Sequence, residues 1–177
     1  YDVHGKNHHQ AGTFGCHVNE ISLLRSDQGL VKCSPNINPE LFNATIGGLG
    51  LTGLILSVKF QLEKICGPYI DSETVKFHNL GEFFAIDEDS KTKFSHTMAW
   101  IDCLAKGKNL GRGLYMRGNW SDKKSDPKDQ RVCAPGLNIP MEMPKILLNP
   151  IFMNVFNTAY YHKQLRQNVK SLSHYEP

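Results

Sequence analysis

The clearest pattern of hydrophobic and polar positions begins at Leu54, where apolar and polar residues alternate. In an extended chain, alternate side chains point to opposite faces, so such alternation is typical of a strand with one buried face. The apolar positions on that face are Leu56, Val58, Phe60 and Leu62, and the polar positions between them are Ser57, Lys59, Gln61 and Glu63. We therefore predict a half-buried strand in this part of the chain.

Patterns on either side predict a mixture of strands and helices. Residues 16–34 resemble a hairpin around the turn sequence SDQG at 26–29. Pro39 favours the first turn of a short helix, which Gly47 and Gly48 would end. Further along, we expect a strand near 69–77, a helix near 79–88, strands at 93–103 and 111–120 that could pair, a long loop at 121–149 and a helix near 151–165.

These elements make an α+β chain in two parts, with no internal repeat and a boundary near Gly67. Hydrophobic content of 40% and charged content of 21% are sufficient for a buried core. The net charge of +3 is small, and the basic residues are scattered, so we expect no nucleic-acid partner. The longest apolar run, at 49–56, falls far short of the roughly 20 residues that a membrane helix needs.

Cysteine usage points to a reducing compartment. The chain contains 5 cysteines, which are widely spaced and include no CxxC pair. An odd number of scattered cysteines is typical of free thiols. We expect a cytoplasmic protein, with peripheral membrane association as an open alternative.

The opening segment gathers residues that zinc would accept as ligands: His4, His8, His9, Cys16 and His17. However, His4 and His8 would share a face only on a helix, which the glycines of this segment disfavour. We therefore predict no metal site. Backbone N–H groups in glycine-rich turns also suit anions and flat polar rings, and Lys6 could place a positive charge beside a phosphate or a reduced flavin. A surface loop with chance histidines explains the glycines less well.

A second glycine-rich segment, GLGLTG at 48–53, satisfies the pattern GxGxxG. A dinucleotide-binding fold needs that pattern after a strand and before a helix, whereas here the predicted order is reversed. The match therefore does not indicate that fold. The glycines still allow a close approach of the backbone or positive φ angles, and the alternative is a tight turn into a strand.

Several stretches resemble one family over essentially the whole chain. They are DVHGKNHHQAGTFGCHV at 2–18, ELFNATIGGLGLTGLI at 40–55, AWIDC at 99–103, LGRG at 110–113 and NTAYYHK at 157–163. These resemble the flavoprotein oxidoreductases of the vanillyl-alcohol-oxidase type, with a PCMH-type FAD-binding domain, and within them the decaprenylphosphoryl-β-D-ribose oxidase group. The resemblance implies that residues 1–66 form the C-terminal part of the FAD-binding domain and 67–177 the first half of an antiparallel-sheet substrate domain.

The resemblance also implies roles for individual residues. Contacts to non-covalently bound FAD fall to Tyr1, Asp2, Val3, His4, Gly50, Gly53, Leu54 and Ile55. The substrate pocket falls to His4, Gly5, Lys6 and Trp100. Catalytic roles fall to His4 and Lys6, which would orient substrate or stabilise charge.

The implied reaction is oxidation of a secondary alcohol of a sugar, or of a lipid-linked sugar phosphate, by hydride transfer to flavin. By the same resemblance, the FAD pyrophosphate loop precedes residue 1 and the catalytic base follows residue 177, so we expect this fragment alone to be inactive. Two alternatives stay open: a non-catalytic binding module for a sugar or lipid-linked sugar, and a zinc-dependent hydrolase that uses the histidines. The sequence leaves the oligomeric state open.

Overall fold

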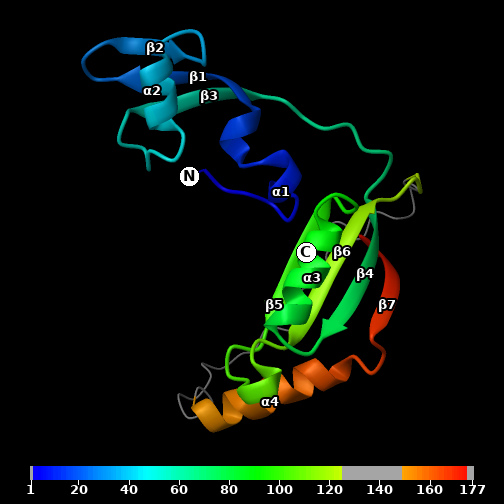
Figure 1. Cartoon of the computed structure of the whole chain (residues 1–177). Coiled ribbons are helices and arrows are strands. Elements are labelled where there is room, and N and C mark those ends of the chain that lie inside the picture. The colour runs from blue at the N-terminus through cyan, green and yellow to red at the C-terminus, as the bar shows by residue number, and fades with distance from the viewer. Residues whose placement is uncertain (1, 125–148, 175–177) are drawn as a thin grey trace, which may run out of the picture. The chain divides into compact units, whose positions relative to one another are not determined.

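The computed structural model describes residues 2–124 and 149–174 and divides into two compact units (Figure 1). Unit 1 comprises Tyr1–Lys64, and unit 2 comprises Ile65–Pro177. Both units combine helices with an antiparallel sheet, which agrees with the predicted α+β class. The assignment of the two parts to an FAD-binding and a substrate domain stays a prediction.

Unit 1 is built on a three-stranded antiparallel sheet with the order β2-β1-β3. Its elements are α1 (His8–Ala11), a 3-10 turn η1 (Phe14–His17), β1 (Val18–Arg25), β2 (Gly29–Cys33), α2 (Pro39–Thr45) and β3 (Leu54–Phe60). The predicted hairpin is confirmed as β1 and β2, with Arg25 opposite Gly29 at the turn. The predicted helix is confirmed as α2, with Pro39 in its first turn.

The core of unit 1 is small because only one helix of more than one turn packs on the sheet. Its buried side chains are Val18, Ile21, Leu23, Cys33 and Phe42, against which Leu41, Ile46 and Val58 pack. Most of this core therefore comes from β1 and from the face of α2 that carries Phe42. Burial raises the pKa of the Cys33 thiol.

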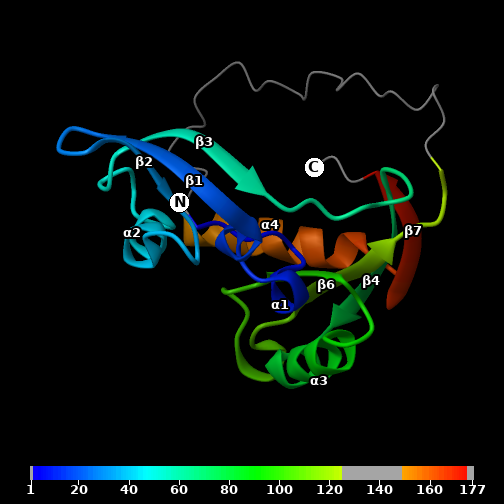
Figure 2. The ribbon, with the colours of Figure 1, turned by 90° about the horizontal axis from the view of Figure 1, so that it is seen from above.

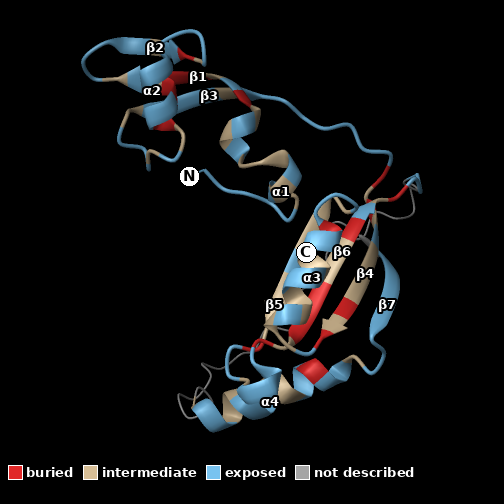
Figure 3. Ribbon diagram, viewed as in Figure 1, coloured by how far each residue is buried: buried red, intermediate tan, exposed pale blue. Residues whose placement is uncertain are grey.

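Strand β3 is confirmed, but the prediction that it is half-buried is wrong. Val58 is its one side chain of intermediate burial, and the others are exposed (Figure 3). β3 lies at an edge of the sheet, so only β1 flanks it, and Val58 is the residue of β3 that packs against the core. Leu62 lies beyond the end of the strand and is exposed.

Unit 2 is built on a four-stranded antiparallel sheet with the order β5-β6-β4-β7. Its elements are β4 (Tyr69–Phe77), α3 (Leu80–Ser90), β5 (His96–Ile101), a 3-10 turn η2 (Gly107–Asn109), β6 (Gly113–Trp120), α4 (Pro150–Lys163) and β7 (Asn168–His174). The predicted pairing of 93–103 with 111–120 is confirmed as β5 and β6. The predicted loop at 121–149 lies mostly outside the described residues.

Helix α3 covers one face of this sheet (Figure 2). It begins where the Asn79 side chain accepts a hydrogen bond from the Glu82 N–H, an arrangement that satisfies a free donor of the first turn. Phe83 and Ile86 pack against the buried strand residues Phe77 and Tyr115. The opposite face of the sheet carries Trp100 and its pairing partner Leu114.

Helix α4 crosses the end of the sheet at which β4 and β5 finish (Figure 1). Asn149 caps it by accepting a hydrogen bond from the Phe152 N–H, with Pro150 in its first turn. The Tyr161 hydroxyl donates to the Phe77 carbonyl at 3.2 Å and fixes the helix to the strand end. None of the described helices is both long and apolar enough to span a membrane. The four cysteines among the described residues are free thiols.

Candidate active site

The opening segment of unit 1 is held in place by hydrogen bonds to the turn η1. The Phe14 N–H donates to the Val3 carbonyl at 2.7 Å, and the Gly15 N–H donates to the Asp2 carboxylate at 2.8 Å. A Cβ on Gly15 would lie 2.5 Å from a methyl carbon of Ile46, so only glycine allows this close packing. Residues 2 and 3 therefore have a defined conformation although both are exposed.

The Asp2 carboxylate is stabilised in its charged form. The Gly15 N–H, and to a smaller extent the Thr13 hydroxyl, hold its pKa below the ordinary value of an aspartate. The Asp2 carboxylate therefore already accepts hydrogen bonds from groups of the protein. Tyr1, which the sequence also predicts as a flavin contact, lies outside the described residues.

The HGK motif forms a turn in which His4 and His8 meet. The His8 N–H donates to the Gly5 carbonyl at 3.3 Å, and the two imidazole rings lie 4.5 Å apart, centre to centre. The expectation that glycine would keep these histidines apart is wrong, because a turn rather than a helix brings them together. Among the described residues, no group of three histidine, cysteine or acidic side chains is placed to hold a metal ion.

His4 and Lys6 both point into solvent in this structure. The His4 Nδ1 lies 3.2 Å from the Gly5 carbonyl, which restrains the ring. Lys6 makes no hydrogen bond or ion pair with any described residue. An unused imidazole nitrogen and an unused ammonium group therefore stand on one turn, where both can contact a bound molecule.

The glycine-rich segment lies between a helix and a strand, α2 and β3, which confirms the reversed order. Gly53 adopts φ 146°, and a Cβ there would lie 3.0 Å from the Leu24 carbonyl oxygen of the neighbouring strand. The segment is pinned at its end, because the Arg25 guanidinium donates to the Thr52 carbonyl at 3.0 Å. Gly50 adopts φ 79°, with nothing within 4 Å of a Cβ placed there.

The two glycine-rich segments meet in unit 1. A Cβ on Gly47 would lie 3.6 Å from the Cβ of Asp2, and Gly15 is packed beneath Ile46. The start of the glycine-rich loop therefore lies directly against the segment that leads into the HGK turn. Sequence reasoning assigned both segments to one cofactor, and the structure places them side by side.

Residues 49–55, which come next in the chain, expose an apolar surface that suits a flat, largely apolar ring system. Leu49, Leu51, Leu54 and Ile55 are exposed, Leu51 to 88% of its full surface. Gly50 leaves the backbone between the first two open to a ligand. The exposed aliphatic side chains beside a backbone that carries no side chain at Gly50 offer an apolar surface to a flat ring.

In unit 2, the predicted substrate residue Trp100 packs against helix α4. Its ring lies 4.7 Å from that of Tyr160, centre to centre, in a T-shaped arrangement. Phe156 also stacks with Tyr160, with the two ring centres 6.3 Å apart. Met98, two residues before Trp100 in β5, is exposed on the same face of the sheet. The side chain of Trp100 is therefore supported by α4 at the edge of an exposed face.

The ion pair between Asp102 and Arg112, close to Trp100 in the chain, was not predicted from the sequence. Asp102 is 2% exposed and accepts hydrogen bonds from Nε of Arg112 at 3.1 Å and from the Asn157 amide at 2.8 Å. Asp102 and Arg112 stand in the quoted stretches AWIDC and LGRG, but their spacing does not reveal the pair. The signal was an acidic residue directly after an apolar strand, which is unusual unless it has a partner.

Comparison with known proteins identifies relatives over nearly the whole chain. The decaprenylphosphoryl-β-D-ribose oxidase of Mycolicibacterium smegmatis is 32% identical over 98% of this chain and 40% of its own length. A protein of Streptomyces coelicolor, described as an uncharacterised protein in the mprA 5′ region, is 31% identical over 81% of the chain and 40% of its own length. The chain is homologous to the FAD-dependent oxidoreductases of the vanillyl-alcohol-oxidase family.

A more distant member of this family matches a shorter stretch. Cytokinin dehydrogenase 4 of Arabidopsis thaliana is 37% identical over 26% of the chain and 9% of its own length. No family model matches the chain. The chain spans about 40% of the length of the Mycolicibacterium and Streptomyces relatives. The relatives confirm the resemblance, and their names, oxidase and dehydrogenase, agree with the predicted class of oxidoreductase.

Proposed function

We propose that the intact protein is an FAD-dependent enzyme that oxidises a secondary alcohol of a sugar or a lipid-linked sugar phosphate. The observation that carries this proposal is the contact between the HGK segment and the glycine-rich loop in unit 1. Both segments belong to a chain that is 32% identical to an oxidase whose name specifies a lipid-linked ribose. The same relative supports a lipid-linked sugar as the partner molecule.

The flavin would be held without a covalent bond by backbone groups of unit 1. Residues 2–4 would offer the backbone of the opening segment, and 50–55 the open loop at the start of β3. Gly53 contributes by conformation, since its φ of 146° directs the chain from the loop into the strand. When bound, the flavin supplies the hydride acceptor for the alcohol carbon.

Polar groups of unit 1 would orient the substrate, and the role of Trp100 of unit 2 rests on the family resemblance alone. Lys6 donates hydrogen bonds to a sugar hydroxyl or phosphate oxygen, since its ammonium group carries only donors. The imidazole of His4 binds the reacting hydroxyl or stabilises the negative charge that develops on its oxygen. Trp100 offers an apolar ring against a sugar face. No residue of this chain is assigned as the base.

Kinetics of variants in the full-length enzyme test this assignment. His4→Ala and Lys6→Ala should each lower kcat/KM about 100-fold, because each removes a positioned polar contact to the transition state. The melting temperature should change little, since both side chains are exposed. His9→Ala is the control, because this histidine follows the turn directly and has no assigned role. Unchanged kcat/KM in both variants would contradict the active-site assignment.

The two alternative functions make different predictions for the same protein. A sugar-binding module without catalysis would purify without flavin and would retain affinity for the sugar. A zinc hydrolase would contain stoichiometric zinc after purification without a histidine tag. Flavin absorbance that bleaches on addition of a sugar phosphate, with no bound zinc, would favour the oxidoreductase over both.

A further inference from the structure

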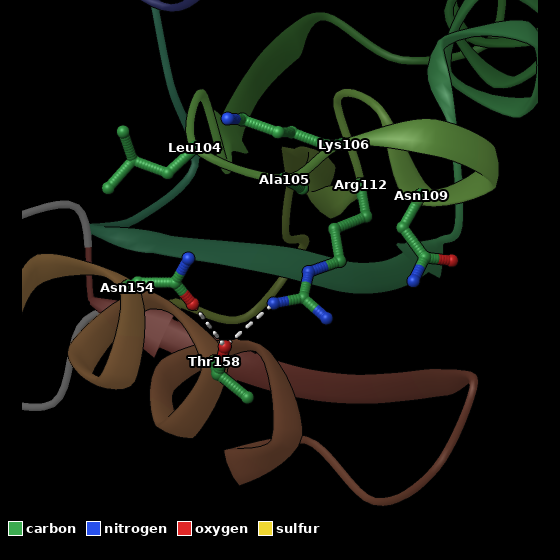
Figure 4. Close-up of a pocket in the computed structure, with 7 residues that line it drawn as sticks. All are labelled: Leu104, Ala105, Lys106, Asn109, Arg112, Asn154 and Thr158. Carbon is green, nitrogen blue, oxygen red and sulfur yellow. Dashed lines mark hydrogen bonds between the residues drawn. The ribbon is translucent and has the colours of Figure 1, made fainter. Parts of the chain in front are cut away.

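A polar pocket of about 390 Å³ lies in unit 2, between the loop that follows β5 and helix α4 (Figure 4). Its lining residues are Leu104, Ala105, Lys106, Asn109, Arg112, Asn154 and Thr158. None of them belongs to the residues assigned above to flavin or substrate. The volume falls in the range of small-molecule sites, roughly 300–1,000 Å³.

Two hydrogen bonds among the lining residues leave the Asn154 amide nitrogen as a free donor among the described residues. The Arg112 guanidinium donates to the Thr158 hydroxyl at 2.9 Å, and that hydroxyl donates in turn to the Asn154 carbonyl oxygen Oδ1 at 3.5 Å. The Asn154 oxygen is thereby occupied. Its amide nitrogen, which only donates, is left on the side of Lys106 (Figure 4).

The charge of the lining is positive and uncompensated by any lining carboxylate. Asp102, which does not line the pocket, accepts a hydrogen bond from Nε of Arg112 at 3.1 Å and forms an ion pair with Nη2 at 3.0 Å. The third nitrogen, Nη1, has no hydrogen-bond partner among the described residues, although the side chain is only 13% exposed and its guanidinium lies over the Tyr161 ring at 4.8 Å. Lys106 adds an ammonium group that is also without a partner in the described part of the chain.

We infer that this pocket binds a small molecule through an anionic oxygen group, a phosphate or a carboxylate. Three nitrogen groups, on Lys106, Arg112 and Asn154, offer only donors, and two of them are positively charged. Charge-assisted hydrogen bonds to oxyanions are about twice as strong as neutral ones. Asp102 and Thr158 hold Arg112 in one orientation, so this lining residue loses little conformational freedom when an anion binds.

Titration calorimetry on the full chain tests this site with inorganic phosphate and, separately, with succinate, at constant ionic strength set with chloride. Saturable 1:1 binding of either anion supports the site, and the better ligand identifies the anionic group. Lys106→Gln should weaken that binding about tenfold. Asn154→Asp should abolish it, because a carboxylate then replaces the inward donor. Both positions are exposed, so neither change should impair folding.

Lys108→Gln is the matched control. Lys108 stands two residues from Lys106 in the same turn, is exposed and does not line the pocket. Its loss should change the affinity by less than twofold. The inference is overturned if neither anion binds saturably, or if Lys108→Gln weakens binding as much as Lys106→Gln does, because the attraction would then be one of general charge.

Discussion

Units 1 and 2 differ in how much of each sheet is covered by other parts of the unit. In unit 1, β3 and the loop before it leave a row of large aliphatic side chains exposed, including Leu49, Leu51 and Leu54. In unit 2, helix α3 covers one face of the sheet, and two ion pairs of low exposure stabilise it, Asp102–Arg112 after β5 and Glu73–Arg117 between β4 and β6. The exposed apolar residues of unit 1 lie in the segment that sequence reasoning assigns to the flavin.

The polar contacts of unit 2 are more deeply buried than those of unit 1. Arg117 joins β6 to Glu73 of β4 at 2.9 Å and to the Ser90 hydroxyl of α3 at 3.0 Å. In unit 1, the ion pair of Arg25 with Asp27 lies in an exposed turn. We conclude that partly buried ion pairs join the strands and helices of unit 2, whereas the Arg25–Asp27 pair of unit 1 joins only residues of one exposed turn.

The largest effect is expected from Asp102→Ala in unit 2. The change leaves the Arg112 guanidinium buried without its carboxylate and removes the acceptor of the Asn157 amide. Removal of one partner from a buried ion pair costs about 3–5 kcal/mol. Both tryptophans of the chain, Trp100 and Trp120, belong to unit 2, so their fluorescence during urea unfolding measures the free energy of unfolding of this unit.

Asp27→Ala in unit 1 is the control for this experiment. Its carboxylate pairs with Arg25 in an exposed turn, where such ion pairs contribute at most about 1 kcal/mol. The urea midpoint of unit 2 should not move. If Asp102→Ala and Asp27→Ala destabilised the chain equally, the contrast between the two units would be wrong.

A smaller effect is expected from Gly53→Val in unit 1. The valine side chain would meet the Leu24 carbonyl oxygen and would have to adopt φ near 146°, a strain of about 2–3 kcal/mol. In the full-length protein, bound flavin should be lost, as measured by its absorbance after gel filtration. Gly29→Ala should cost about 1 kcal/mol and retain flavin, because φ there is 67° but nothing lies within 4 Å. Equal flavin content in both variants would contradict the role assigned to the loop.

Most elements of the fold could be predicted because their signals are local. The SDQG turn and Pro39 mark the hairpin and α2 within a few residues. Strand β7 was missed, because its pairing partner β4 lies about a hundred residues earlier and its alternation is weak. The burial of β3 was predicted wrongly, because period-two alternation shows which side chains share a face but not whether anything covers that face.

The sequence motifs of the candidate site could be predicted, but the contacts that hold these motifs in place could not. The HGK turn and the glycine-rich loop stand as contiguous stretches, so they can be recognised directly. The contact between them depends on Gly15, Ile46 and Asp2, which are far apart in sequence and meet only in the folded chain. The same is true of Asp102 and its amide donor Asn157, which are joined across a separation of 55 residues.

The smallest expected effect concerns the single carboxylate that holds the opening segment of unit 1. The Gly15 N–H donates to Asp2 and lowers its pKa, so this stabilisation is present above the pKa of an unfolded aspartate and is lost as the pH falls through the lower folded pKa. In an NMR titration of the chain, the Gly15 amide proton should shift with a midpoint below 3.8, the ordinary value. Asp2→Asn should abolish that shift and leave the spectrum of unit 2 unchanged. A Gly15 midpoint at or above 3.8 would show that the opening segment is not held by this bond, and that unit 1 is looser than the structure indicates.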